Sequence, residues 1–355
     1  MIINASRMQF FLKCRRLQYF YDQRLVQLGL TQPLSMGSAY HKGAAILVAT
    51  KNRANAITAA ETEYRNAMKE AFILPEEKPI HERNIELVKR MVNAQADQYT
   101  RETWTVLMPE VEFCVDIPGT RHHCGYIHRI LYPEDCERPG TIGELAIRMG
   151  SSGMGRCPDE RCYVAHKLRG RSDGILNWNS LIWILERKTS GMKQHIWWDQ
   201  WYLSHQISAY IWGVRKATGL PVHGVLVEKS PKPAKNQDPF SFDYSPEREP
   251  YIRSEADLGE FQDEISRVAR DYETAAFDAD PFREFYRNPL SCTSYNRRCD
   301  FWDTCKRNGE VQPGQYRLRQ RDYVELEYYK MLNMEPPVVM GDELKTEVLE
   351  REDNQ

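Results

Sequence analysis

Three features are missing from this sequence, and each absence narrows the range of functions that the protein could have. The chain contains no apolar run approaching the ~18 residues that a membrane span needs. Residues 1–7 lack the basic-then-apolar layout of a signal peptide, so we expect a soluble cytoplasmic protein with no membrane partner. The formal net charge is only −2 over 355 residues, so bulk charge does not indicate a nucleic-acid binder. Any basic surface must therefore be local.

Nine cysteines are present, and in a reducing compartment they are more typical of metal ligands or buried thiols than of disulfides. Three of them, Cys292, Cys299 and Cys305, fall close together near the C-terminal end. A tetrahedral metal centre needs a fourth ligand, and Cys14 is the candidate. A set of four cysteines suits zinc or an iron–sulfur cluster.

A second cysteine-rich stretch interrupts the chain at residues 120–168. Its four thiols could hold a structural zinc, but their spacing is irregular and only the last two form a close pair. Unliganded cysteines in an inserted loop region are the favoured interpretation. The four are Cys124, Cys136, Cys157 and Cys162.

The stretch 170–190 predicts two strands joined by a tight turn at 177–180. Asn and Ser fill the turn, and an apolar, β-favouring run follows it. That run ends in Glu186, Arg187 and Lys188. Side chains two apart on a strand share a face, so Glu186 and Lys188 point the same way. Folding the hairpin at its turn brings Asp173 within a residue or two of Glu186.

Two carboxylates this close repel each other and raise each other's pKa unless a divalent cation neutralises them. Hard oxygen ligands suit Mg²⁺ or Mn²⁺, and a neighbouring lysine can polarise water or steady developing negative charge. The pattern therefore indicates metal-assisted phosphodiester hydrolysis. The alternative is an ordinary strand end with solvated charges, because such spacings also occur by chance.

Helical segments are expected before and after this hairpin. The first covers residues 6–30, a second begins at 37–41 with His41 near its start, and two more lie in 53–105. A helix over 191–216 carries Gln206 and Tyr210 on one face. Three tryptophans in the same helix could stack on bases, although core packing is favoured for at least two of them. They are Trp197, Trp198 and Trp201.

The remaining strands are predicted at 106–117 and 222–229, with loop at 230–250 and a helix at 254–276. Glu110 or Glu112 could approach the hairpin, although most acids on a strand face water. We divide the chain into a single domain over 1–310, which includes the 120–168 insertion, and a charged helix and tail over 311–355.

The order of these motifs resembles the RecB-like branch of the PD-(D/E)XK nuclease family. It is most similar to the iron–sulfur members: the AddB nuclease domain, CRISPR-adaptation nucleases, and phage or mobile-element exonucleases. One departure is the spacing between the first two late cysteines, which is six residues where the family commonly has two. The matching motifs, in chain order, are Ser6-x7-Cys14-Arg15-Arg16, Gly37-x3-His41, Asp173, Glu186-Arg187-Lys188, Gln206-x3-Tyr210, and the cysteines 292, 299 and 305.

The resemblance implies an α/β, restriction-endonuclease-like mixed sheet flanked by helices. It implies Mg²⁺ or Mn²⁺ held by His41, Asp173, Glu186 and the carbonyl of Arg187, with Lys188 activating water. A [4Fe–4S] cluster, with zinc as the alternative, would join the N-terminal helix to the C-terminal loop. Gln206 and Tyr210 would support the site, and Arg15 and Arg16 would grip DNA phosphates.

Three functions remain open from the sequence. The first is a metal-dependent DNA exonuclease in phage or mobile-element recombination, repair or end processing. The second is the same fold as a subunit that trims ends for a helicase, recombinase or integrase, since this chain carries no helicase motor. The third is a non-catalytic protein that binds DNA ends, which would have no use for a lysine–carboxylate set.

Overall fold

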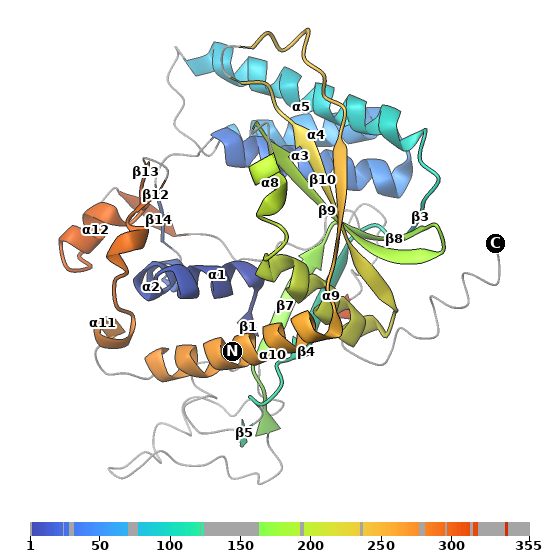
Figure 1. The fold of residues 1–355 in the computed structure, drawn as a ribbon. Coiled ribbons are helices and arrows are strands. Elements are labelled where there is room, and N and C mark those ends of the chain that lie inside the picture. Colours follow the sequence, from blue (N-terminus) through green and yellow to red (C-terminus); the bar gives the residue numbers. More distant parts are fainter. Residues whose placement is uncertain are drawn as a thin grey trace, which may run out of the picture.

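A computed structural model describes the chain over residues 2–23, 25–27, 32–69, 77–120, 122–123, 163–191, 195–234, 237–276, 281–294, 297–312, 315–318 and 338–339. The fold is α/β, with a mixed five-stranded sheet flanked by helices (Figure 1). None of the helices in these ranges is both long and apolar enough to cross a membrane.

The five-stranded sheet has the order β11-β10-β9-β8-β3. Strands β9 and β10 run parallel, and the other pairs are antiparallel. At the turn between β8 and β9, Asn179 and Ser180 have φ values of 53° and 61°, as a two-residue type I′ hairpin requires. The strands are β3 (Thr105–Met108), β8 (Gly174–Trp178), β9 (Leu181–Ser190), β10 (Val222–Pro231) and β11 (Glu247–Ile252).

A second sheet, of order β1-β7-β4-β15, lies beside the first, and both chain segments that link the two sheets bend sharply. The chain passes from β3 to β4 through Pro109 and Glu110, and from β7 to β8 through Asp173. Because β3 pairs with β8 and β4 pairs with β7, these two bends face each other. The strands are β1 (Ile2–Ile3), β4 (Val111–Asp116), β7 (Lys167–Ser172) and β15 (Val338–Val339).

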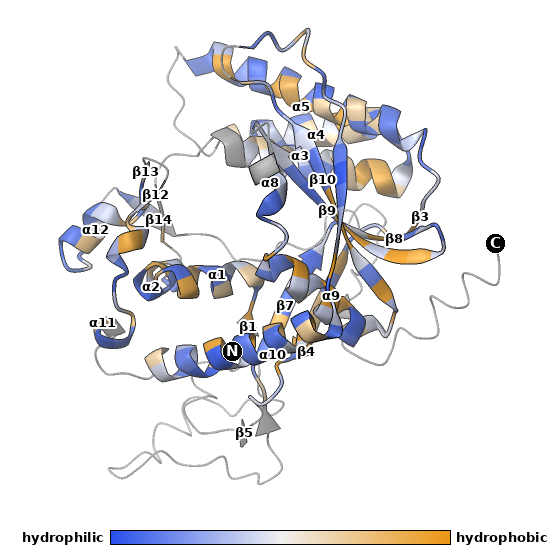
Figure 2. Cartoon of the chain, viewed as in Figure 1, coloured by the Kyte–Doolittle hydropathy of each residue, from blue (hydrophilic) through white to orange (hydrophobic). Residues whose placement is uncertain are grey.

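Helices α1, α9 and α10 pack with these strands around the main hydrophobic core. Helix α10 buries Leu258, Phe261 and Ile265 at helical spacing, while hydrophilic residues also lie along its length (Figure 2). Helix α9 begins at the side-chain cap of Ser204 and ends at Gly219, whose φ is 70°. The helices are α1 (Ala5–Lys13), α9 (His205–Thr218) and α10 (Glu255–Ala276).

Close packing of α9 onto the strands depends on two glycines that flank one ring. A Cβ at Gly170 of β7 would lie 2.4 Å from the Phe113 ring, and a Cβ at Gly213 of α9 would lie 2.1 Å from it. The Phe113 side chain is completely buried between them. Hence only glycine at these positions lets the helix approach the sheet this closely.

Helices α3, α4 and α5 form a layer on the opposite side of the five-stranded sheet (Figure 1). They share their own hydrophobic core, which includes Tyr40, Tyr64 and Val88 and is distinct from the main core. Their bounds are α3 (Gln32–Thr50), α4 (Arg53–Lys69) and α5 (Lys78–Tyr99), and the short helix α8 (His195–Asp199) precedes α9.

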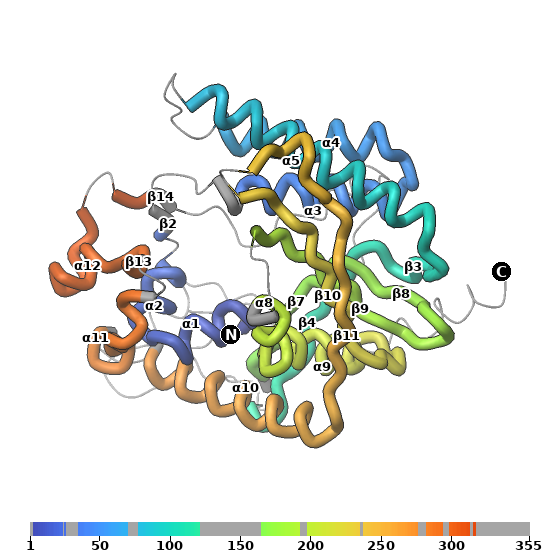
Figure 3. Tube along the Cα trace, turned by 45° about the horizontal axis from the view of Figure 1, so that its top comes forward, coloured from blue at the N-terminus to red at the C-terminus, as the bar shows by residue number. Residues whose placement is uncertain are grey.

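A lobe at one side of the molecule joins the start of the chain to its later part, as Figures 1 and 3 both show. Leu17 and Phe20 from α2 pack there against Phe301. The lobe contains α2 (Arg15–Asp22), β2 (Leu25–Gln27), α11 (Pro281–Glu284), the 3₁₀ turn Pro289–Ser291, β12 (Thr293–Ser294), β13 (Arg297–Arg298), α12 (Trp302–Lys306) and β14 (Tyr316–Leu318). The remaining strands, β5 (His122–His123) and β6 (Tyr163–Val164), pair with each other.

The helices predicted at 53–105 and 254–276 are confirmed, as is the strand that follows α9. The single helix expected over 6–30 is wrong, because Cys14 is extended (φ −165°, ψ 111°) and separates α1 from α2. The helix over 191–216 is likewise two helices, and the strand over 106–117 is two strands in different sheets.

Two further expectations also fail. Residues 247–250, expected to be loop, belong to the edge strand β11. Residues 316–318, expected to lie in a C-terminal helix, form β14 and pair with β2. Beyond residue 318 the predicted tail, apart from β15, lies outside the described residues, as does the cysteine-rich part of the 120–168 insertion.

Candidate active site

Asp173 and Glu186 lie opposite each other, as the hairpin pattern predicted. Gly174 pairs with Leu185, and the amide of Asp173 donates a 3.1 Å hydrogen bond to the carbonyl of Leu185. The next residue along β9 is Glu186. The predicted first strand is not continuous, however, because Asp173 occupies the bend between β7 and β8. At this bend a Cβ on Gly174 would lie 3.2 Å from the carbonyl oxygens of Met108 and Pro109.

His41 reaches this pair from the helical layer. Its Nδ1 lies 3.1 Å from Asp173 Oδ1. The sequence placed His41 near the start of a helix, but α3 begins at Gln32, so the imidazole projects from the middle of the helix. The predicted convergence of an imidazole with Asp173 is nevertheless present.

Glu186 and Lys188 share one face of β9 and form an ion pair in which Lys188 Nζ contacts Glu186 Oε1. Burial raises the pKa of Glu186, Lys188 acts against that rise, and Asp173 adds to it. Burial acts to lower the pKa of Lys188, but the Glu186 carboxylate raises it overall. Lys188 is therefore a protonated cation at neutral pH.

Asp173 is held in its ionised form. Burial alone would raise its pKa, but His41 and Arg187 bring the pKa well below its usual range. The amide of Arg187 donates a 2.6 Å hydrogen bond to Asp173 Oδ2, and its guanidinium donates a 3.2 Å bond to the Asp173 carbonyl oxygen. The neighbouring positive charges and the hydrogen bond to Oδ2 thus favour the carboxylate.

Gln206 and Tyr210 approach from α9, one turn apart. Gln206 Nε2 donates to Glu186 Oε1 at 2.8 Å and to the Tyr210 hydroxyl oxygen at 2.9 Å. The amide group therefore fixes the orientation of the Glu186 carboxylate. These contacts agree with the supporting role that the resemblance implies for both residues.

Glu110, one of the two acids that the sequence named as able to approach the hairpin, lies close enough to Asp173 for the two charges to interact. Its side chain is buried at the bend between β3 and β4, and Arg171 lies 3.5 Å from it. Burial raises the pKa of Glu110, Arg171 opposes this, and the Asp173 charge raises it further. The signal in the sequence was Pro109, which breaks the strand opposite Asp173 and turns the following acid inward.

The donor set fits a hard divalent cation in its chemistry. Buried carboxylates that interact with one another and an adjacent imidazole are ligands that Mg²⁺ and Mn²⁺ accept. Among the described residues, no three His, Cys, Asp or Glu side chains are arranged as a ligand group. The described contacts instead pair Asp173 with the His41 imidazole and Glu186 with the Lys188 ammonium.

The four cysteines singled out by the sequence line one small cavity of about 20 Å³ in the side lobe. Cys14 comes from the break between α1 and α2, and the others come from the turn, β-hairpin and helix beyond residue 291. Burial and, to a smaller extent, the neighbouring Cys299 raise the pKa of Cys305 to about 11. The four thiols therefore line one small cavity, although no three of them are arranged as a metal-ligand group.

The two arginines proposed as phosphate contacts lie in the same lobe with side-chain partners. Arg15 pairs with Asp271 at 2.7 Å. Arg16 is buried, donates from Nε to the carbonyl of Phe285 at 2.7 Å, and stacks on the Phe282 ring at 3.8 Å. Arg16 is therefore withdrawn from the surface that DNA could reach, and it holds the lobe together.

A scan against protein-family models and a search of curated proteins each give no match to this chain.

Proposed function

We propose that this protein is a metal-dependent DNA exonuclease of the restriction-endonuclease-like class. The observation that supports this most directly is the convergence of His41, Asp173 and Glu186 beside Lys188. An imidazole from a helix and two acids from adjoining strands meet next to an amine. Titratable groups that are buried together and shift one another's pKa are typical of catalytic sites.

In this proposal His41, Asp173, Glu186 and the carbonyl of Arg187 hold Mg²⁺ or Mn²⁺. The ion, when bound, polarises the phosphodiester and lowers the pKa of water. The residues themselves do the positioning. Gln206 orients Glu186, the Arg187 amide orients Asp173, and the dry surroundings strengthen each of these contacts.

Lys188 is assigned the role of an electrostatic and water-orienting group. Because its ammonium is protonated, it donates hydrogen bonds and steadies the negative charge that develops on the phosphoryl oxygens during attack. With a divalent ion bound beside Glu186, the Lys188 ammonium would be free to donate to a substrate phosphate.

The four cysteines are proposed to bind a metal centre with a structural role. The centre would tie Cys14 to residues almost 300 positions later, which removes chain entropy from the unfolded state. The resemblance favours [4Fe–4S], and a single zinc ion is the alternative that a set of four cysteines also suits. Metal analysis and a visible absorption spectrum of anaerobically purified protein distinguish these two.

The test of the proposed function is cleavage of end-labelled single- and double-stranded DNA in Mn²⁺. We expect wild-type protein to shorten the DNA from its ends and Lys188→Ala to be at least ~100-fold slower. Lys216→Ala, an exposed change at the far end of α9, is the matched control. Equal cleavage by wild type and Lys188→Ala would contradict the proposed nuclease function. Binding of DNA ends without any cleavage by wild type supports the non-catalytic alternative instead.

A further inference from the structure

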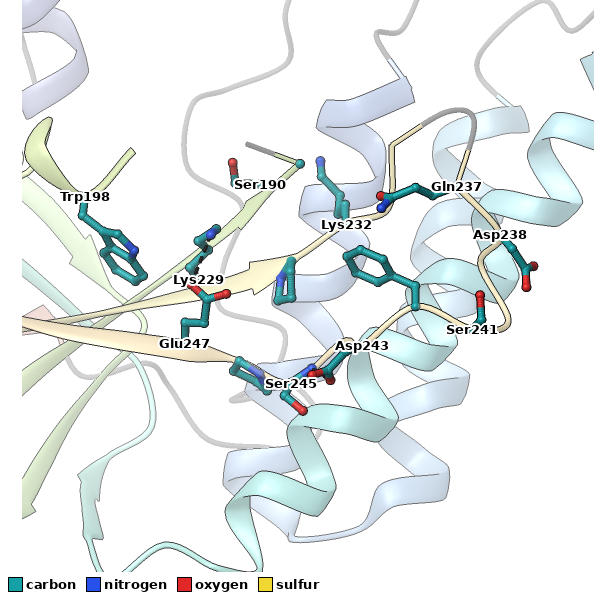
Figure 4. Close-up of a pocket in the computed structure, with 14 residues that line it drawn as sticks. Ser190, Trp198, Lys229, Lys232, Gln237, Asp238, Ser241, Asp243, Ser245 and Glu247 are labelled. Atoms are coloured by element: carbon teal, nitrogen blue, oxygen red, sulfur yellow. Dashed lines mark hydrogen bonds and ion pairs between the residues drawn. The ribbon is translucent and has the colours of Figure 1, made fainter. Parts of the chain in front are cut away.

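A cavity of about 730 Å³ opens directly beside the candidate active site, where β9 and β10 end and β11 begins (Figure 4). Ser190 on its wall is two residues beyond Lys188, hence on the same face of β9 and about 6.6 Å further along the strand. Lys229, also on the wall, is the register partner of Lys188 on β10. A DNA strand bound at the candidate active site can therefore continue into this cavity.

Three tryptophans connect the site with the cavity. The Trp201 ring centre lies 5.6 Å from Lys188 Nζ, and the Trp198 ring centre lies 5.7 Å from Lys229 Nζ. Trp197 is between them, 4.5 Å from Trp198 and 5.7 Å from Trp201. Trp197 and Trp201 are buried in the main core, whereas Trp198 is only half-buried and lines the cavity.

The charges on the wall leave one cation without a partner. Lys229 donates to Glu247 at 3.2 Å. Asp238 accepts the amide of Phe240 at 3.0 Å, and Asp243 accepts the amide of Ser245 at 2.9 Å. Within the described part of the chain, the Lys232 ammonium has no hydrogen-bond or ion-pair partner, although its side chain is half-buried.

A backbone hydrogen bond, and not an ion pair of its side chain, holds Lys232 in position. Its amide donates a 2.9 Å hydrogen bond to the carbonyl of Ser190, which extends the pairing of β10 with β9. Figure 4 shows Trp198 and Lys229 at one end of the cavity and Lys232 further along its wall, before Gln237, while Asp238 points away from them. An aromatic surface and an unpaired ammonium thus lie at separate positions along the wall of one space.

We propose that this cavity binds one unpaired DNA nucleotide next to the scissile phosphodiester, with its base against Trp198 and a phosphate at Lys232. The inference rests on the proposed function and specifies its substrate as a single-stranded DNA end. The volume falls in the range of about 300–1,000 Å³ that is typical of sites for small molecules. A base stacks on an aromatic ring whatever its identity, so the site is expected to tolerate any sequence.

The first experiment measures binding of a fluorescent single-stranded oligodeoxynucleotide in EDTA, where no cleavage occurs. We expect Lys232→Gln to weaken binding and to reduce the salt dependence by about 0.7 in log K per log salt, the contribution of one phosphate contact on a single strand. Lys216→Gln is the matched control and should change neither quantity. Unchanged affinity and slope in Lys232→Gln overturn the proposal.

The second experiment tests the base contact. Oligonucleotides that carry 5-iodouracil at successive positions are irradiated with the full-length protein, and the crosslinked peptide is identified by mass spectrometry. We expect one position to crosslink to Trp198, and Trp198→Ala to weaken binding about five- to a hundredfold while Trp198→Phe loses less. A crosslink elsewhere overturns the placement. Should Trp198→Ala not fold, Trp198→Phe and Lys232→Gln still test it.

The outcomes separate this proposal from the nuclease assignment. If wild type cleaves DNA but Lys232→Gln binds and cleaves as well as wild type, the cavity is not a nucleotide site and the nuclease assignment stands. If no metal supports cleavage yet Trp198 crosslinks, the cavity proposal stands and the nuclease assignment fails. The proposed ligand is overturned if blunt duplex DNA binds as tightly as single-stranded DNA. It is also overturned if single-stranded RNA, or a divalent cation alone, binds at this cavity more tightly than single-stranded DNA does.

Discussion

Arg187 contacts Asp173 from two directions, with its backbone amide on Oδ2 and its guanidinium on the carbonyl oxygen. The same guanidinium donates to the Tyr99 hydroxyl at 2.6 Å and lies 3.5 Å from Glu228, on the face of β9 opposite Glu186. Gln95 of α5 donates to Glu228 at 3.1 Å and accepts from Tyr40 of α3 at 2.6 Å. A buried polar network therefore supports the site from behind the sheet.

Replacing Arg187 with methionine should destabilise the protein by about 3 kcal/mol, because Glu228 and Tyr99 lose a buried cationic partner. Chemical denaturation measures the free energy of unfolding. Arg65→Met is the matched control: Arg65 is an exposed arginine that pairs with Glu61 and Glu82, and its loss should cost less than about 1 kcal/mol. Equal losses in the two variants would show that the network contributes nothing.

Gln206→Leu should weaken Mn²⁺ binding about 10- to 100-fold, because the Glu186 carboxylate loses the amide that orients it. Calorimetric titration of the folded variant with Mn²⁺ gives the affinity. Tyr210→Phe keeps the contact between Gln206 and Glu186 and should change the affinity less. Wild-type affinity in Gln206→Leu would contradict a supporting role for this residue.

Mn²⁺ should stabilise the wild-type protein. The free energy of unfolding should rise by about 2.7 kcal/mol when the free ion is at a hundred times its dissociation constant. Glu186→Gln should remove most of this gain, since it replaces a charged ligand with a neutral one. Thermal unfolding at several Mn²⁺ concentrations measures the effect. An equal gain in wild type and in the variant would place the ion elsewhere.

Without metal, stability should fall as pH rises through the folded-state pKa of Glu186. Burial and Asp173 raise that pKa, so above the usual glutamate value of about 4.3 the folded state binds more protons than the unfolded state. Glu186→Gln should remove this pH dependence. Chemical denaturation in EDTA across the pH range gives the free energy of unfolding of both proteins. A wild type that gains stability relative to the variant as the pH rises would contradict the prediction.

Gly213→Ala should cost about 1–2 kcal/mol of stability even though alanine is the better helix former. The added methyl would lie 2.1 Å from the buried Phe113 ring, and overpacking outweighs helix propensity there. Gly259→Ala in α10 is the control, because no atom lies within 4 Å of its Cβ position. It should stabilise by up to about 1 kcal/mol. Denaturant midpoints compare the two, and a stabilised Gly213→Ala would mean that α9 does not pack as described.

The sequence was most informative where the structure is local. The hairpin of β8 and β9 follows from its turn residues, and the turn alone fixes the register that places Asp173 opposite Glu186. The helical pair α4 and α5 and the helix α10 follow from periodicity in the same way. Each of these depends on residues within about twenty positions of one another.

Non-local features were not predictable in this way. The helix breaks at Cys14, whose side chain lines the same cavity as three cysteines far along the chain. Nothing in the local helical pattern indicates this break. Strand β11 contains Pro250 and several charges, which are typical of a loop, but an edge strand that pairs on one side only tolerates them. Glu110 is buried because of the bend opposite Asp173, which depends on strands paired across two sheets.

The candidate site draws its members from two hydrophobic cores. Glu186 and Lys188 lie on a strand of the main core and Asp173 lies at the bend between two of its strands, while His41 is carried by the helical layer with a core of its own. A modest separation of that layer would remove the imidazole and leave every strand intact. On heating, the DNA cleavage proposed for this site should therefore be lost no later than the sheet unfolds.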